Sequence, residues 1–162
     1  MALATGDTGL AECLIGEATF VLQGSGPWFL LLALYFRAIL AVRRGNADGA
    51  ISLVRESLTR IRDLHDKFEF VYTLVPLAAA AVLKGDDVWA ARILGARDAV
   101  TERTGATVVD PSVHDLREQA EQQVRARLGP DRWDRAYAAG RVTSVDSLLK
   151  EIDGVLRSPA RA

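Results

Sequence analysis

The residue types that most often carry chemistry are sparse and scattered in this chain. His65 and His114 are each followed by an aspartate but belong to different expected helices, and Cys13 is the single cysteine. A metal site needs several ligands at close spacing, and neither histidine has such partners in the sequence. We therefore expect solvated or capping histidines, with no metal and no cofactor.

Nucleophilic and acid–base catalysis have no recognisable signature either. The sequence contains no Gly-x-Ser-x-Gly turn for a serine nucleophile and no Gly-x-x-x-x-Gly-Lys-Ser/Thr phosphate loop. The carboxylates Glu56, Glu69 and Glu102 are far apart, and none lies in an apolar stretch beside a second carboxylate. We expect a non-catalytic protein, with a small all-α enzyme as the remote alternative.

A series of arginines in the C-terminal third is the strongest basic feature. Acidic residues, among them Glu118, Glu121, Asp131 and Asp134, are interleaved with it, and the formal net charge of the whole chain is −1. Nucleic-acid modules usually carry a clear basic excess, so the series predicts a mixed, solvated face. Direct DNA binding through the C-terminal helices is kept as the alternative function. The series comprises Arg117, Arg125, Arg127, Arg132, Arg135 and Arg141.

Composition indicates an ordinary globular protein. Of the 162 residues, 49% are apolar and 25% are charged, which suits one domain with a sizeable core. No signal peptide is evident, and the most apolar stretch, 27–42, is interrupted by Arg37. That stretch is too short and too polar for a membrane span, so we expect a buried helix and a cytoplasmic protein.

Periodicity and punctuation predict an all-α chain of about eight helices. Thr143 is expected to cap the last of them. Trp28, Trp89 and Trp133 are expected to be packing anchors. The expected helices cover residues 8–23, 27–44, 47–65, 68–84, 87–104, 111–128, 131–139 and 144–156.

The helix starts recur at a fixed spacing. Gly6, Gly45 and Gly85 are 39 and 40 residues apart, and each is followed five residues later by alanine at Ala11, Ala50 and Ala90. A period near 40 with a helical pattern is typical of stacked helix pairs. We therefore expect antiparallel helix-pair repeats, forming a right-handed solenoid or a closed bundle.

The pattern Leu-x-x-x-Ala-x-x-Ala-x-x-x-Gly-x-x-x-x-Ala, which begins at Leu34 and again at Leu74, resembles the tetratricopeptide repeat. Arg37 departs from it, because that position is normally apolar and is matched by Leu77 in the next unit. Residues 83–150 resemble the C-terminal module of LuxR-type, MalT-like ATP-binding regulators. The resemblance rests on 90–96 (Ala-Ala-Arg-Ile-Leu-Gly-Ala), 104–106 (Thr-Gly-Ala) and 133–141 (Trp-Asp-Arg-Ala-Tyr-Ala-Ala-Gly-Arg).

This resemblance implies the helical sensor or scaffold part of a transcriptional regulator, either a C-terminal fragment or a stand-alone relative. Residues 1–104 would form the repeats, with the first one truncated, and 105–157 an extension packed on the last repeat. Residues 158–162 would form a frayed tail. A protein, a small effector or the missing regulatory domains would be the partner, and an uncapped N-terminal end would favour a homodimer.

In this repeat class the first helix of each pair lines a concave face, and the resemblance places the candidate groove there. The groove would be largely apolar and suited to a peptide or small ligand. The alternative is that the C-terminal helices fold back and fill it, or that missing upstream repeats cover it. The groove residues would be Leu32, Tyr35, Ile39, Val42, Arg43, Tyr72, Val75, Ala79, Val82 and Leu83.

Overall fold

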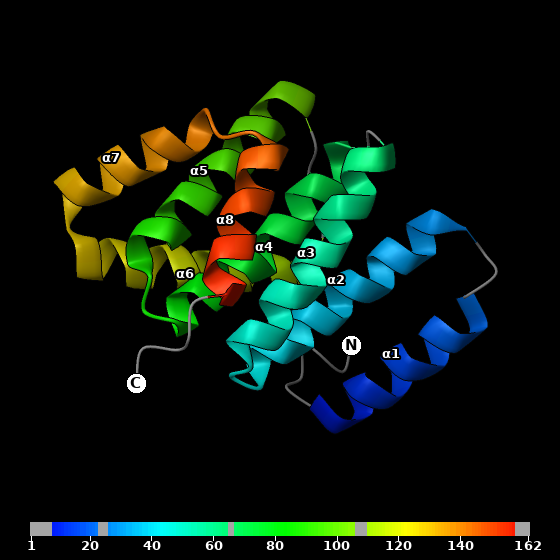
Figure 1. Ribbon diagram of the computed structural model, residues 1–162. Coiled ribbons are helices and arrows are strands. Elements are labelled where there is room, and N and C mark those ends of the chain that lie inside the picture. Colours follow the sequence, from blue (N-terminus) through cyan, green and yellow to red (C-terminus); the bar gives the residue numbers. More distant parts are fainter. Residues whose placement is uncertain (1–7, 23–25, 65–66, 106–109, 158–162) are drawn as a thin grey trace.

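The structure is a computed structural model that describes residues 8–22, 26–64, 67–105 and 110–157. Within these ranges the chain is all-helical, with eight helices and no strand, as the sequence predicts (Figure 1). The helices are α1 (Thr8–Leu22), α2 (Pro27–Arg43), α3 (Ala47–Leu64), α4 (Lys67–Leu83), α5 (Asp87–Thr104), α6 (Pro111–Leu128), α7 (Pro130–Arg141) and α8 (Val145–Arg157).

The turns before α3 and α5 are built alike, which is the structural form of the 40-residue repeat. Gly45 and Gly85 have φ values of 72° and 73°, a left-handed conformation that side chains with a Cβ rarely adopt. The next residue then caps the new helix. Asn46 Oδ1 accepts from Gly49 N at 2.9 Å, and Asp86 Oδ1 accepts from Trp89 N at 3.0 Å.

The cap of α8 differs from the prediction. Ser144, not Thr143, accepts a hydrogen bond from the backbone N–H of Ser147, at 3.2 Å. The Thr143 hydroxyl instead donates back to Ala139 O, at 3.1 Å, because α7 continues to Arg141. The longer α7 therefore shifts the start of α8 by one residue.

The helices stack in two rows. The first row is α2, α4 and α6, in which successive helices contact one another. The second row is α1, α3, α5 and α7, in which α3 packs on α2 and α4, and α5 packs on α4 and α6. No Cα atoms of α1 and α3, or of α3 and α5, come into contact. Each of these two neighbouring pairs in the second row is therefore separated by a gap.

Helix α8 folds back along the stack and fills one of these gaps. It approaches α3 most closely, and its side chains also reach α5. In Figure 1 it is the red-orange helix between α5 and α3. The buried side chains Leu148, Leu149 and Ile152 belong to the main core cluster, together with residues of α3, α4 and α5. The C-terminal extension is thus divided. Helices α6 and α7 pack on the α4–α5 pair, whereas α8 packs mainly on α3 of the preceding pair.

Helices α5 and α7 cross at a pair of glycines. A Cβ atom added to Gly140 would lie 1.8 Å from Arg92 O, and one added to Gly95 would lie 2.1 Å from Tyr137 O. Both neighbours are backbone atoms, which cannot rotate away. The absence of side chains at these two positions therefore sets the distance between the helices.

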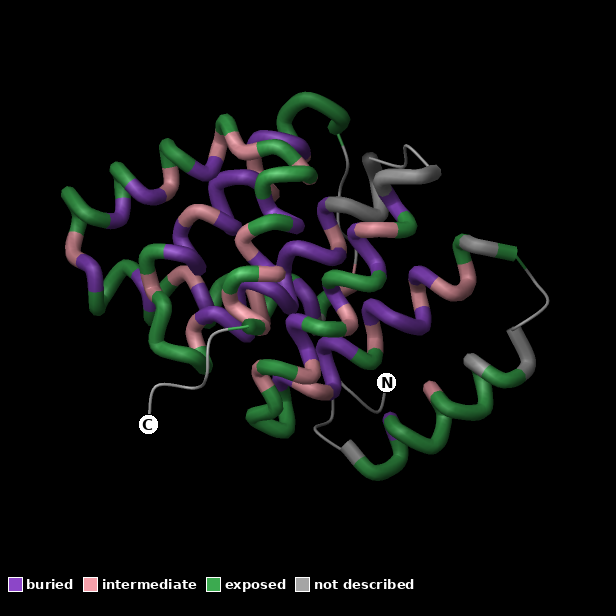
Figure 2. The backbone as a smooth tube through the Cα atoms, viewed as in Figure 1, coloured by how far each residue is buried: buried purple, intermediate pink, exposed green. Residues whose placement is uncertain are grey.

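Burial is concentrated in the central helices, whereas α1 is mostly exposed, as Figure 2 shows. Trp89 and Trp133 are 6% and 1% exposed, which confirms their role as packing anchors. Trp28 is 49% exposed, so that prediction is wrong for Trp28, which lies at the start of α2. Among the described helices, none combines the length and apolar character needed to cross a membrane.

Candidate functional site

The ten predicted groove residues lie on α2 and α4, but most of them are covered. Tyr35, Ile39, Val42, Val75 and Ala79 are buried, and Leu32, Tyr72 and Val82 are half-buried. Only Arg43 and Leu83 are exposed. A ligand could not reach the buried side chains in this arrangement.

Helices α1 and α6 do the covering. Ala11 of α1 and Val113 of α6 belong to one buried cluster with Tyr35, Ile39 and Val75. The proximity of residue 113 to residue 35 depends on how the stack folds, and no local pattern in the sequence reports it.

An open cleft of about 1030 Å³ lies at the end of this face, where Leu83 remains exposed. We call it the turn cleft. One wall is the α2–α3 turn, the second is the α4–α5 turn, and the third is the C-terminal half of α8. Its lining residues are Gly45, Asn46, Ala47, Asp48, Leu83, Lys84, Gly85, Asp86, Val88, Trp89, Arg92, Glu151, Gly154 and Val155.

The charged groups of the turn cleft are largely paired with one another. Lys84 Nζ lies 2.6 Å from Asp48 Oδ1 and joins the two turns. Glu151 of α8 accepts hydrogen bonds from Trp89 Nε1 at 3.0 Å and from Arg92 Nη2 at 2.7 Å. These pairs connect the α4–α5 turn to each of the other two walls.

Exposed apolar side chains remain in the turn cleft. Leu83 is 48% exposed and Val88 is 41% exposed, and both belong to the α4–α5 turn. A partly apolar, partly polar cleft of this kind suits the side chains of a protein segment better than a small ion. The predicted groove includes Leu83 but not Val88. The local signal for Val88 is an apolar residue in the first turn of a helix, where a polar one is expected.

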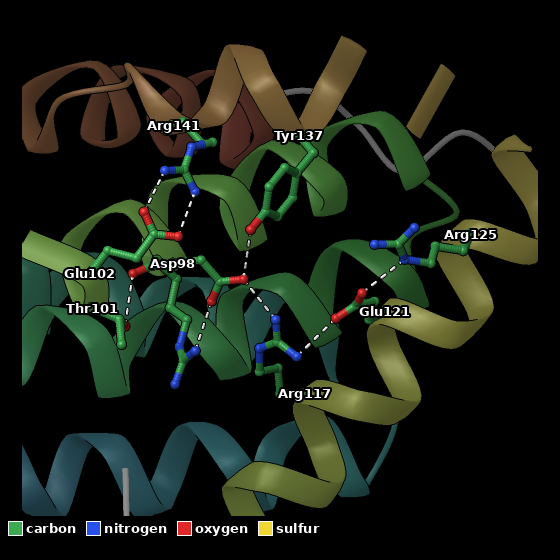
Figure 3. Close-up of polar contacts among 9 residues, drawn as sticks. Asp98, Thr101, Glu102, Arg117, Glu121, Arg125, Tyr137 and Arg141 are labelled. Carbon is green, nitrogen blue, oxygen red and sulfur yellow. Dashed lines mark hydrogen bonds and ion pairs between the residues drawn. The ribbon is translucent and has the colours of Figure 1, made fainter. Parts of the chain in front are cut away.

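A second polar constellation lies among α5, α6 and α7 (Figure 3). The Asp98 carboxylate, 13% exposed, accepts hydrogen bonds from Arg97 Nη1 and Arg117 Nη2, each at 2.7 Å, and from the Tyr137 hydroxyl at 2.9 Å. Burial by itself would raise the pKa of Asp98. The hydrogen bonds from Arg117, Arg97 and Tyr137 outweigh burial and hold the pKa below its usual value.

The same constellation extends along α6. Glu121 pairs with both Arg117 and Arg125 at 2.8 Å, and the Arg125 guanidinium lies 4.3 Å from the centre of the Trp133 ring. Arg141 of α7 pairs with Glu102 of α5. Apart from the contact between the adjacent residues Arg97 and Asp98, these contacts join neighbouring helices or successive turns of one helix. We therefore interpret the constellation as a fastening of α6 and α7 to α5.

The arginine series is accordingly mostly neutralised. Arg117, Arg125 and Arg141 are paired as described above, and Arg127 pairs with Asp87 at 3.2 Å. Arg132 and Arg135 are exposed on α7. Arg125 and Arg127 are exposed as well, whereas Arg117 and Arg141 are half-buried in the contacts that join α6 and α7 to α5. The predicted mixed, solvated face therefore describes four of the six arginines.

The remaining sequence candidates are also dispersed. His114 is exposed and lies 3.0 Å from Glu118, whereas His65 lies outside the described residues. Glu56 pairs with Arg60, and the side chain of Glu69 is outside the described part of the chain. In the described ranges, no three metal-binding side chains of His, Cys, Asp or Glu come together.

The turn cleft is therefore a candidate binding site, because its exposed apolar side chains have no evident structural role. Comparison with known proteins found no matching family model, no matching curated protein and no matching solved structure.

Proposed function

We propose that this chain is a non-catalytic helical-repeat interaction module of a bacterial transcriptional regulator. The observation that carries the binding role is the turn cleft, where Leu83 and Val88 are exposed between paired charges. The regulator context rests on the resemblance of residues 83–150 to the C-terminal module of LuxR-type regulators. The partner would be a protein segment, and its binding would act by favouring one arrangement of the regulator over another.

Direct DNA binding through the C-terminal helices has less support. Four of the six arginines in that region form ion pairs, so their charge is not displayed as one basic surface. No group of side chains in the described residues favours the enzyme alternative.

Site-specific photo-crosslinking tests the proposal. A benzophenone amino acid replaces Leu83 in the turn cleft, and a matched chain carries it at Gln122, an exposed residue of α6. After irradiation in the native host, we expect a protein adduct from position 83 that is absent from position 122 and is lost with Val88→Asp. The same adducts from both positions, or none from position 83, would contradict the proposal.

A further inference from the structure

The repeat places two equivalent gaps along the second row of helices. The first lies between α1 and α3, over α2, and the second lies between α3 and α5, over α4. Leu53 of α3, beside the first gap, is matched 40 residues later by Ile93 of α5. The turns flanking them have the same capping geometry. The kind of segment that fills one gap therefore indicates what kind of segment could bind in the other.

The α3–α5 gap holds an amphipathic helix, which is α8. Leu148 and Ile152 are fully buried there, and Leu149 is 9% exposed. Acidic residues at the margin of this apolar stripe bind cationic side chains on either side. Asp153 pairs with Arg55 of α3, and Glu151 pairs with Arg92 of α5. The chain itself thus shows that gaps of this kind accept a helix with an apolar stripe and flanking carboxylates.

The α1–α3 gap is an open cleft of about 500 Å³ whose walls are partly apolar and partly polar. Phe20 of α1 lines it and is 77% exposed, while Ile15 and Leu53 line it from α1 and α3. A phenylalanine this exposed is apolar area that a partner would remove from water. The cleft is lined by Glu12, Ile15, Gly16, Phe20, Arg37, Leu40, Ala41, Arg44, Asn46 and Leu53.

The charge of the α1–α3 gap distinguishes it from its filled counterpart. Arg37 lines the cleft at the position that Leu77 occupies, fully buried, in the second repeat. Arg37 is exposed and has no hydrogen-bond or ion-pair partner among the described residues. Arg44, in the same cleft, already pairs with Glu12 at 2.7 Å. Arg37 is therefore the cationic group that a bound helix would meet.

We propose that the α1–α3 gap binds an amphipathic helix of a partner protein, with a carboxylate of that helix paired to Arg37. This goes beyond the turn cleft and its proposed function, since it names a separate surface and the chemistry of its partner. Charge complementarity favours an acidic helix, and α8 supplies the structural precedent. The protein's own α8 is engaged in the other gap.

Peptides derived from α8 test the proposal without a partner from the cell. The probe is a fluorescein-labelled peptide of residues 144–157, held helical by a lactam between the exposed positions Asp146 and Lys150. Three pairs of peptides carry either Glu or Lys in place of Leu148, Leu149 or Ile152. Binding to the full chain is followed by fluorescence anisotropy.

We expect at least one Glu peptide to bind the wild-type chain about tenfold more tightly than its Lys counterpart, as a close charge-assisted pair allows. Arg37→Glu should reverse that order. Arg43→Glu, an exposed arginine of the same helix that does not line the cleft, should leave the order unchanged. Circular dichroism confirms that both variants keep their helical content.

Three outcomes would overturn the proposal. One is saturable binding that is indifferent to Arg37→Glu, and another is the absence of binding by every peptide at millimolar concentration. The third is a dimer, seen by light scattering and abolished by Arg37→Glu, because a second copy would then be the occupant. None of these depends on crosslinking from position 83, so the two proposals fail independently.

Discussion

The α3–α5 gap and the α1–α3 gap lie at equivalent positions in successive repeats, but only the first is filled. The first is closed by α8, whose three apolar side chains join the main core. The second is open, and Phe20 remains in contact with water. Since the repeated turns are alike, the difference comes from the side chains in each gap and from the presence of α8. The molecule therefore has a closed end at α5–α8 and an open end at α1–α2.

The largest expected effect comes from exchanging the residues that distinguish the two gaps. Leu77→Arg places a cation in the core without a carboxylate to pair with it. This substitution should lower the free energy of unfolding by more than about 4 kcal/mol. Arg37→Leu, at the equivalent exposed position, should change the melting temperature by only about 2 °C. Thermal melts by circular dichroism compare the two. A cooperative melt of Leu77→Arg near the wild-type temperature would contradict the comparison.

A substitution at the α5–α7 glycine crossing should destabilise the fold nearly as much as Leu77→Arg. Gly140→Ala drives a Cβ atom into Arg92 O and should destabilise the fold by about 3 kcal/mol, by forcing α5 and α7 apart. Gly154→Ala in α8 is the matched control, since a Cβ there meets nothing within 4 Å. It should stabilise the chain by about 0.5–1 kcal/mol through helix propensity. Urea unfolding gives both values, and equal effects would show that the crossing is not tight.

Shortening a side chain in α8 and one in α1 compares the filled and the open gap with smaller expected effects. Ile152→Ala removes a fully buried side chain and should cost about 2–4 kcal/mol. Leu14→Ala on α1, where the side chain is 49% exposed, should cost less than about 1 kcal/mol. Both are measured by urea unfolding. If Leu14→Ala proved as costly as Ile152→Ala, the open end would be closed in solution.

The smallest effect concerns pH at the closed end. Because the folded-state pKa of Asp98 lies below its unfolded value near 3.9, its contribution to stability is present above about pH 4 and is lost as pH falls through the folded-state pKa. Asp98→Asn should lower stability at pH 7 by about 1–2 kcal/mol, since the two arginines lose a charged acceptor. It should also flatten the acid limb of the stability–pH curve below about pH 5. Parallel curves for the two proteins would assign that limb to other carboxylates.

Local signals predicted the helices well because each boundary depends on nearby residues. The glycine–asparagine and glycine–aspartate turns, together with the proline at the start of α6, fix where helices end and begin. Thr143 was misassigned as a cap because the length of α7 depends on its packing against α5. Trp28 does not act as a packing anchor, because a tryptophan at the start of a helix is buried only where another helix covers it, and the sequence does not show whether one does.

The candidate sites were less predictable for the same reason. The predicted groove residues divide between two buried clusters, with Tyr35, Ile39 and Val75 in one and Val42 and Ala79 in the other. The sequence did not reveal that Val113 of α6 and Ala11 of α1 join the first of these clusters. The turn cleft depends on Glu151 meeting Trp89 and Arg92, some 60 residues away. Contacts between residues so far apart in the chain produce no recognisable spacing pattern in the sequence.

The sequence by itself determined that the chain is helical, that its pairs repeat near every 40 residues, and that Arg37 interrupts an apolar position. Those properties follow from backbone propensities and from spacing along one helix. Only the tertiary structure decided which faces remain open. Burial of a helix face depends on which distant helix covers it, and here α6 closes the predicted groove, α8 closes one gap, and the gap beside Arg37 is left open.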